Sequence, residues 1–223
     1  MRRIPGGGWL ALLGGGEFSF GETEEADAAW LEKTPPGVVG FVPAASGSEE
    51  YPQHFAEYLQ EAFEREVETL PLYRPRDARR GRNAERVAAC AAVYLGGGVS
   101  DHLIDTLAGS PALAALEASL SGGGVVVAIA AAAQALGAAT RGIAGGRTIP
   151  GLGWLPGGAV EANFDPDHDR RLRSLLLSGG VEWAVGIPAE GALLLGPDGA
   201  FETVGSVFLL SSPDGELEEL ESE

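Results

Sequence analysis

Short apolar runs that end in glycine or proline alternate with longer amphipathic stretches along most of the chain. Such runs are typical of buried strands, and the amphipathic stretches between them are typical of helices. The pattern predicts strands at 9–13, 38–42, 67–72, 92–95 and 125–129, and helices at 24–33, 52–65, 83–89, 101–107 and 111–120. This alternation predicts an α/β fold: a doubly wound, mostly parallel sheet with helices on both faces.

The pattern changes after Gly137. Short apolar runs at 184–187, 192–195, 201–204 and 207–210 are separated by turns such as Gly196-Pro197-Asp198-Gly199, and one helix is predicted at 167–177. Strands joined by such short turns pair with their neighbours in sequence. We therefore expect the domain to end in an antiparallel meander.

The length of 223 residues fits one sizeable domain, which we place at 1–213. Six of the last ten residues are acidic, so the segment 214–223 cannot bury much apolar surface. We expect this acidic tail to be disordered.

The chain is strongly acidic, with 15 Lys and Arg against 32 Asp and Glu and a net charge of −17. This charge argues against nucleic acid and anionic membranes as partners. The single cysteine, Cys90, fits a small buried side chain in a reducing compartment. The apolar run 9–13 is too short for a signal peptide, and no run is long enough for a membrane span, so we expect a cytoplasmic protein.

Glycine triplets follow two of the predicted strands. Gly14-Gly15-Gly16 follows the first, and Gly96-Gly97-Gly98 follows the fourth. Ligands of such sheets bind where the strands end, and glycine lets the backbone approach a ligand closely. Neither triplet has the further residues of a phosphate-binding loop, so we predict no nucleotide cofactor.

The segment 122–136 has the outline of a strand, a tight turn and a helix, which is where many α/β hydrolases carry a nucleophile. Small residues flank the serine of a G-x-S-x-G turn, and here Ala128, Ala130 and Ala132 occupy those places. An ordinary alanine-rich strand and helix of the core would have the same sequence pattern. The segment is compatible with a hydrolase architecture that lacks the nucleophile.

Asp165, Asp167 and Asp169 alternate as in a calcium loop, but Arg170 and Leu176 stand where such a loop needs glycine and glutamate. A helix start fits better, with Asp165 as the N-cap and Pro166 as the first helical residue. We therefore predict no metal site.

Ser100, Asp101 and His102 follow the second glycine triplet and are candidates for the lining of a pocket. Adjacent residues rarely form a catalytic triad, because triad partners converge from separate elements. Ser100 is equally suited to cap the helix that begins there.

Six segments, in order, carry a resemblance to a known family: LALLGGGEF at 10–18, VVGFVPAASGS at 38–48, YLGGGVSDHLIDTL at 94–107, the turn at 122–137, PGLGWLPGGAVEANFD at 150–165 and VGIPAEGALLL at 185–195. The chain resembles the serine peptidases of family S51, the group of cyanophycinase and aspartyl dipeptidase (peptidase E). The resemblance implies a class I glutamine-amidotransferase-like fold.

The resemblance also assigns roles to positions. Ala130 stands where the family's GxSAGA turn has its nucleophilic serine. Asn163 stands where the DQHF-like segment of the cyanophycinase branch has its histidine, and Glu161 opens that segment. The oxyanion-hole positions match the peptide N–H groups of Gly97 or Gly98 and of Ala131. The resemblance implies a homodimer, as in cyanophycinase, or a monomer, as in peptidase E.

Loss of the nucleophile from a serine triad reduces turnover by roughly 10⁶-fold, and loss of the base adds little more. We therefore expect a non-catalytic protein that binds a small acidic or peptide-like ligand or serves as a partner subunit. The alternative is an active serine hydrolase with relocated catalytic residues, drawn from Ser46, Ser48, Ser100, His102 and His168.

Overall fold

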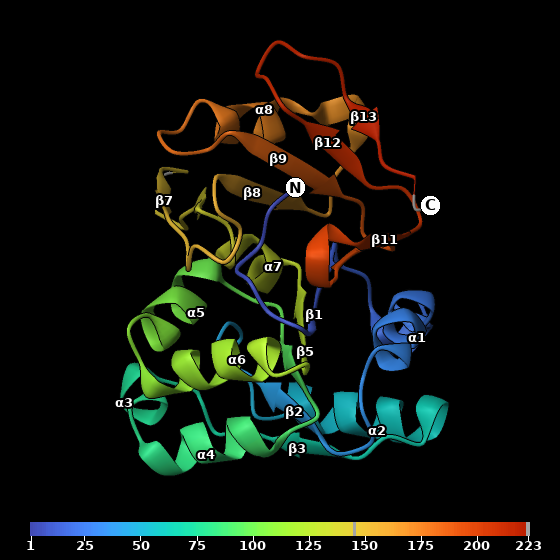
Figure 1. The fold of residues 1–223 in the computed structure, drawn as a ribbon, viewed down its shortest axis with the longest axis vertical. Helices are drawn as coiled ribbons and strands as arrows, with labels where there is room; N and C mark the ends of the chain where they lie inside the picture. The colour runs from blue at the N-terminus through green and yellow to red at the C-terminus, as the bar shows by residue number, and fades with distance from the viewer. Residues whose placement is uncertain (145, 222–223) are drawn as a thin grey trace.

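A computed structural model describes residues 1–144 and 146–221. Its main element is a seven-stranded sheet in the order β11-β10-β1-β5-β4-β2-β3 (Figure 1). The five parallel strands are β1 (Trp9–Leu13), β2 (Val39–Val42), β3 (Val67–Thr69), β4 (Ala92–Leu95) and β5 (Val125–Ile129). At one edge, β10 (Ala192–Leu195) runs antiparallel to β1, and β11 (Phe201–Val204) runs antiparallel to β10. The α/β architecture with a mostly parallel sheet is thus confirmed.

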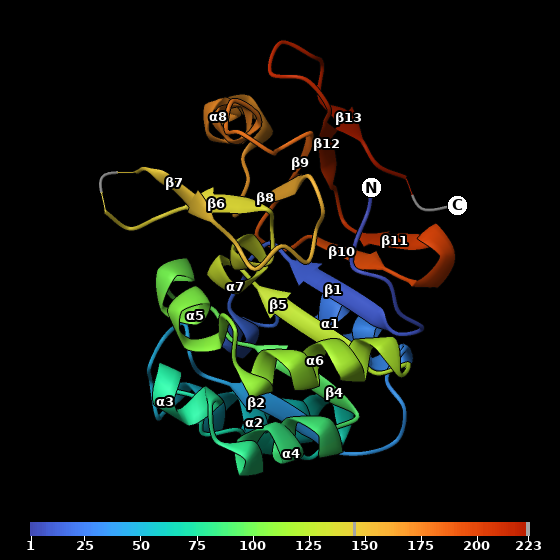
Figure 2. The same cartoon turned by 60° about the vertical axis from the view of Figure 1, so that its left-hand side comes forward.

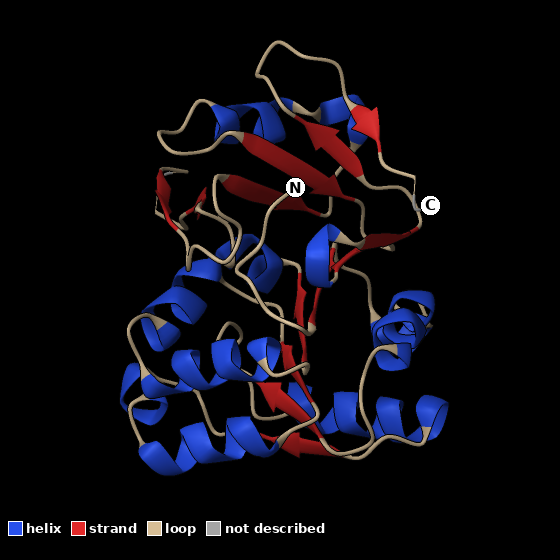
Figure 3. Cartoon of the chain, in the orientation of Figure 1, coloured by secondary structure: helices blue, strands red, loops and turns tan. Residues whose placement is uncertain are grey.

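Helices cover both faces of this sheet (Figure 3). One face is covered by α1 (Glu24–Glu32) and α2 (Tyr51–Phe63), and the other by α3 (Pro75–Ala78), α4 (Gly81–Ala89), α5 (Ser100–Leu107), α6 (Pro111–Ser121) and α7 (Ala131–Ala135). Successive residues of a strand face opposite sides, so Leu10 and Leu12 pack on the α4 to α7 side while Ala11 and Leu13 pack on the α1 side.

The predicted C-terminal antiparallel strands are present, but they do not form one meander, because they divide between two sheets. The strands β10 and β11 join the large sheet, whereas β8 (Gly158–Ala162), β9 (Trp183–Ile187), β12 (Phe208–Leu210) and β13 (Glu218–Glu219) form a second sheet in the order β13-β12-β9-β8. In this small sheet β8 and β9 are parallel. The small sheet lies beside the end of the large one, as Figure 2 shows.

Two further elements flank the small sheet. A short hairpin of β6 (Ala139–Arg141) and β7 (Thr148–Pro150) precedes β8, and the helix α8 (Arg170–Leu176) packs on β8 and β9. The start of that helical region agrees with the sequence, since the Asp165 side chain accepts a hydrogen bond of 3.0 Å from the Asp167 N–H. The first turn is a 3-10 helix, Pro166–His168.

One apolar core joins the two sheets. Val160 of β8 and Val185 of β9 are fully buried in the same cluster as Leu12 of β1 and Val126 of β5. Burial of this shared cluster stabilises the position of the small sheet against the end of the large one. The edge between the sheets is therefore a fixed surface on which a site can be built.

The expectation of a disordered tail differs from the structure, which pairs Glu218 and Glu219 with Leu209 and Phe208. The Leu220 N–H also donates to the carbonyl of Val207, at 2.8 Å. Backbone hydrogen bonds and partly buried leucines hold this segment although its other side chains are acidic. Residues 222 and 223 lie outside the described part of the chain.

Among the described residues, no helix is long and apolar enough to cross a membrane. Cys90 is buried as expected, and its Sγ lies 3.3 Å from the Arg86 carbonyl. Burial raises the pKa of the Cys90 thiol to about 11, so this residue is an uncharged part of the core at neutral pH.

Candidate functional site

The turn between β5 and α7 is strained. Ala130 adopts φ 52° and ψ −117°, a conformation that L residues other than glycine rarely take. Such a backbone costs roughly 1–3 kcal/mol and persists only where the surrounding structure imposes it. Here the Ala130 N–H donates to the Leu13 carbonyl at 2.9 Å, and the Ala130 carbonyl accepts from Gln134 at 3.1 Å. The sharp strand-to-helix turn predicted from the sequence is therefore present.

Asn163 lies beside the first glycine triplet. Its backbone has φ 49°, which asparagine tolerates, and its N–H donates to the Gly14 carbonyl at 2.9 Å. The Asn163 side chain packs directly on Gly15, where any Cβ would overlap its Oδ1. Ala130 and Asn163 thus both attach to the residues at the end of β1, one to Leu13 and the other to Gly14.

The second glycine triplet supplies backbone to the same place. A Cβ placed on Gly97 would lie 3.7 Å from the Ala130 Cβ, so the two residues are neighbours. Gly98 has φ 148°, and a Cβ placed on it would overlap the backbone of Ala45, so only glycine fits there. The triplet therefore brings the end of β4 against the strained turn after β5.

Tyr51 lies close to this triplet, because a Cβ placed on Gly96 would come within 3.1 Å of its ring. The ring is partly buried. Burial raises the pKa of the Tyr51 hydroxyl to about 12, and the adjacent Gly97 backbone opposes that rise.

A cavity of about 220 Å³ opens beside Asn163. It is lined by Glu161, Asn163, Phe164, Asp165, His168 and Arg171. They come from β8, from the segment that leads into α8 and, for Arg171, from the first turn of α8. The small sheet therefore provides the charged side chains of this region, and the large sheet provides the glycine-rich backbone.

Glu161 forms a buried ion pair in the floor of this region. The Arg141 Nη2 donates to its Oε1 at 2.7 Å, and Glu161 is only 4% exposed. Burial raises the pKa of the Glu161 carboxyl, and the charges of Arg141 and Arg171 oppose that rise. Among the described residues, neither Glu161 Oε2 nor Arg141 Nε has a hydrogen-bond partner. The pair is therefore half satisfied.

His168 and Asp165 form an exposed pair on the rim. Their Nδ1 and Oδ2 atoms are 2.6 Å apart. This hydrogen bond raises the pKa of the His168 imidazole and lowers the pKa of the Asp165 carboxyl. The imidazole therefore carries positive charge at a higher pH than an isolated histidine would.

The three adjacent candidates after the second triplet do not converge. The Ser100 hydroxyl donates to the Ala131 carbonyl at 2.8 Å and fixes α5 against the turn. The Asp101 Oδ2 accepts from the Ile143 N–H at 3.0 Å and anchors the β6–β7 hairpin. His102 is exposed on α5. Only Ser100 contacts the neighbourhood of Ala130.

The other candidate hydroxyls build a turn. The Ser46 Oγ lies 3.3 Å from the Pro43 carbonyl and accepts from the Ser48 N–H at 3.2 Å. The Ser48 Oγ accepts from the Glu50 and Tyr51 N–H groups at 3.2 and 3.1 Å. Both side chains therefore stabilise the turn that leads into α2.

A second buried carboxyl lies behind the first glycine triplet, on α1. Asp27 is fully buried and accepts hydrogen bonds from Thr23 at 2.7 Å, Trp30 at 2.7 Å and Tyr58 at 3.0 Å. Burial raises its pKa to about 6, and these three hydrogen bonds oppose the rise. The Asp27 network ties α1 to α2, with Thr23 and Asp27 buried and Tyr58 partly exposed at its edge.

Sequence reasoning missed Arg141, Arg171 and Tyr51. Arg141 and Glu161 are twenty positions apart and meet because β6 and β8 are neighbours. Tyr51 reads as an ordinary helix residue. Only the run of arginines after Asp169 gave a local signal for Arg171, since cations near the DPD segment can balance its charge.

The mostly parallel sheet, the helices on both of its faces and the C-terminal antiparallel strands define the class of this protein: a peptidase-like α/β fold. In solved structures, the chain is similar to a peptidase from an acI-B1 Actinobacterium, at 21% identity and a TM-score of 0.76, covering 98% of this chain and 97% of that one. It is also similar to a putative peptidase E protein from Listeria monocytogenes EGD-e, at 16% identity and a TM-score of 0.59, covering 92% and 98%. A comparison with curated proteins found no match.

The model of peptidase family S51 matches residues 10–147. This span covers more than half of the chain and includes both glycine triplets and the turn at Ala130. The chain belongs to peptidase family S51.

Proposed function

We propose that this S51 member is non-catalytic and binds a small acidic or peptide-like ligand beside Ala130. The observation that carries the proposal is the turn after β5, which keeps a strained backbone around a methyl group. A methyl group has neither a lone pair nor a transferable proton, so Ala130 cannot attack a carbonyl carbon.

Asn163 supports the same proposal. A neutral amide offers hydrogen bonds but does not accept a proton from a nucleophile near pH 7. Without the nucleophile, a serine-type reaction slows by roughly 10⁶-fold, and the absence of the base then changes little. Two independent replacements are better explained by a scaffold that has changed its use than by a single substitution.

The cavity next to Asn163 supports binding. Arg171 places positive charge on its wall, and arginine is well suited to recognise a carboxylate, whereas the His168 imidazole is already paired with Asp165. The family resemblance assigns further neutral donors, the backbone N–H groups of Gly98 and Ala131. The half-satisfied Glu161 can in addition accept a hydrogen bond from an amide or amine. A small acidic or peptide-like molecule has these complementary groups.

One observation favours the alternative of a relocated hydrolase: the pair of His168 and Asp165 lies on the wall of the same cavity. A nucleophile for this pair is harder to find, because Ser46, Ser48 and Ser100 already make the hydrogen bonds described above. We therefore favour the binding function over the relocated hydrolase.

Calorimetric titration with an Asp-X dipeptide and with succinate tests the proposal, followed by chromatography of the same samples for free aspartate. We expect saturable binding of the acidic molecules, weaker binding of Gly-Gly, and no product after prolonged incubation. Turnover that is abolished by a single substitution at the cavity would establish the hydrolase instead. Absence of binding by all three molecules would contradict the ligand-binding proposal and leave a partner role.

A further inference from the structure

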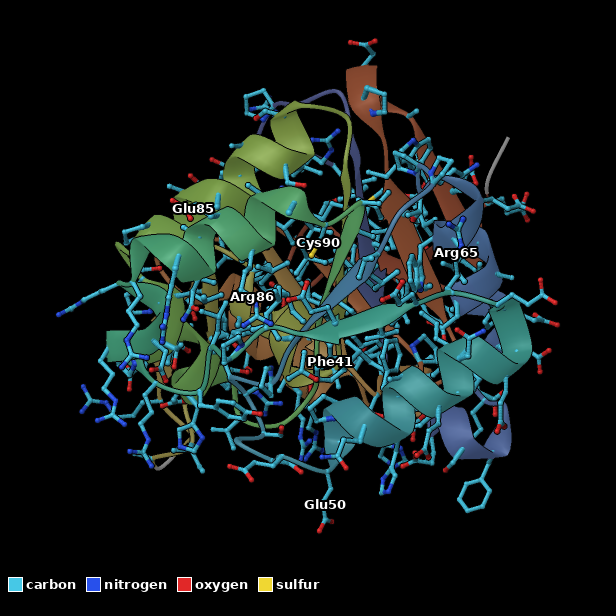
Figure 4. All side chains as sticks on the ribbon, turned by 90° about the horizontal axis from the view of Figure 1, so that it is seen from below. Phe41, Glu50, Arg65, Glu85, Arg86 and Cys90 are labelled. Atoms are coloured by element: carbon cyan, nitrogen blue, oxygen red, sulfur yellow. The ribbon has the colours of Figure 1, made fainter. Side chains whose placement is uncertain are left out.

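Five arginines cluster on the surface of this acidic chain. Arg74, Arg76, Arg79, Arg80 and Arg82 are all exposed, at α3 and the start of α4. Together they make up one third of the 15 Lys and Arg residues of the chain. We call this group the arginine pole. Figure 4 views this end of the molecule, with Glu85 and Arg86 labelled on α4.

The arginine pole is poorly neutralised within its own chain. Asp77 lies 3.5 Å from Arg80 and 3.9 Å from Arg76, and among the described residues Arg74, Arg79 and Arg82 form no ion pair. Neighbouring Arg86 is already paired with Glu68. Glu85 is the other carboxylate of this stretch. Positive charge is therefore in excess along this stretch of the chain.

A matching excess of negative charge occurs on the tail. Asp214, Glu216, Glu218, Glu219 and Glu221 are exposed, and none of them forms an ion pair with a described residue. We call this group the acidic pole. The nearby Arg173 is occupied by Asp169, at 2.7 Å.

The acidic pole is held in place. The Arg173 Nη1 donates to the carbonyls of Pro213 and Gly215 at 2.7 and 2.8 Å, and β13 pairs with β12. Leu217 and Leu220 pack against the apolar clusters below. Binding to this pole would therefore require little further ordering of the backbone.

The two poles lie at opposite ends of the molecule. In Figure 1, drawn with the longest axis vertical, α3 and α4 lie at the lower end and β13 at the upper end, and Figure 2 shows the same arrangement after rotation about that axis. The arginine pole and the acidic pole therefore cannot neutralise each other within one chain. They can do so between two copies.

We propose that this protein self-associates through contact between the arginine pole of one copy and the acidic pole of the next. Five exposed cations face five exposed anions, and each copy keeps one unused pole, so the contact is heterologous and can repeat. The net charge of −17 opposes association at long range. At 0.1 M salt the Debye length is about 10 Å, so the repulsion between distant charges of the two copies is screened. The attraction between the opposite charges that meet at the contact then outweighs it.

The expected affinity is weak, because exposed ion pairs individually contribute little. We expect a Kd of about 10⁻⁴ to 10⁻³ M at 0.1 M salt. Small-angle X-ray scattering over about 0.05 to 2 mM protein reaches this range. The mean mass should rise with concentration at 0.1 M NaCl and return to that of the monomer at 1 M NaCl, where the Debye length is about 3 Å.

Two charge-reversal variants test the contact directly. Both R74E/R79E/R82E and E216K/E218K/E219K should be monomeric alone, because each then carries two poles of the same sign. An equimolar mixture should associate again, because every pole in it has an opposite partner. The matched controls R2E/R147E/R170E and E50K/E57K/E61K change exposed residues elsewhere and should keep the concentration dependence of the wild type.

A monomeric wild type throughout the concentration range would overturn the proposal. So would association that survives both variants, or a mixture that stays monomeric although each variant has a native circular dichroism spectrum. A short DNA duplex at 0.1 M NaCl tests the other partner of the arginine pole. If the wild type did not self-associate but bound this duplex, and R74E/R79E/R82E did not bind it, the arginine pole would be a nucleic-acid site instead. Titration with dipeptide is independent of these outcomes.

Discussion

The two sheets contribute differently to the site at the edge between them. The large sheet contributes backbone: the strained Ala130 turn and the glycines after β1 and β4. The small sheet and the segment after it contribute charged side chains, including Glu161, His168 and Arg171. The backbone of the strained turn and the charged side chains of the cavity thus come from different parts of the fold. Asn163, which follows β8, is the residue that belongs both to the cavity lining and to a predicted reaction-centre position.

The double variant A130S/N163H is the strongest test of this difference. If the turn after β5 and the segment after β8 together retain a reactive geometry and lack only side chains, the variant should hydrolyse an Asp-X dipeptide at least about a hundredfold faster than the wild type. Product formation measured by chromatography checks this. The variants A130S and N163H provide the controls, because each alone lacks one partner and should stay near the wild-type rate. A stable double variant without any gain would show that the backbone is no longer catalytic.

The variant Asp27→Asn tests whether the buried carboxyl on the large-sheet side is structural. Its folded pKa of about 6 lies above the ordinary value of 3.8, so its contribution to stability is complete below about pH 4 and is lost as the pH rises through 6. This shift corresponds to about 3 kcal/mol. We expect the free energy of unfolding of the wild type, relative to D27N, to fall by about that amount between pH 4 and pH 7.

Urea denaturation at the two pH values measures this difference, and the exposed Asp105→Asn provides a matched control. Because all other carboxyls are common to the wild type and D27N, their titration cancels in the comparison. A difference that does not change with pH would contradict the raised pKa that burial gives Asp27.

The variant Arg171→Ala tests the small-sheet side and has the smallest expected effect. Arg171 lines the cavity but is exposed, so its loss should weaken succinate binding by about threefold to tenfold. The neighbouring Arg170→Ala does not change the lining of this cavity and provides the control in the same calorimetric titration. Equal affinities of the two variants would place the ligand elsewhere.

The sequence was most informative about the large sheet. The strands β1, β4, β5, β10 and β11 have the predicted bounds. The first four are continuous apolar runs, which identify buried strands locally, whereas the partly exposed β11 is marked by the turn before it. The strained turn at Ala130 also followed from small residues between a strand and a helix. These features are encoded over a few neighbouring positions.

The small sheet was not predictable in the same way. The strand β8 lies in a glycine-rich stretch and becomes a strand through its parallel pairing with β9, more than twenty residues later. The strand β13 has acidic residues throughout, and its order depends on Arg173 and on pairing with β12. The Arg141–Glu161 pair likewise results from sheet packing. Such long-range contacts leave no local pattern.

The most direct test of the central claim is the intact mass of the wild-type protein after incubation with a serine-directed phosphonate. We expect an unmodified mass, since Ala130 has no hydroxyl and the hydroxyls of Ser46, Ser48 and Ser100 make structural hydrogen bonds. Stoichiometric addition of one phosphonate, located by peptide mapping to any of these serines, would show an activated nucleophile and contradict the non-catalytic function.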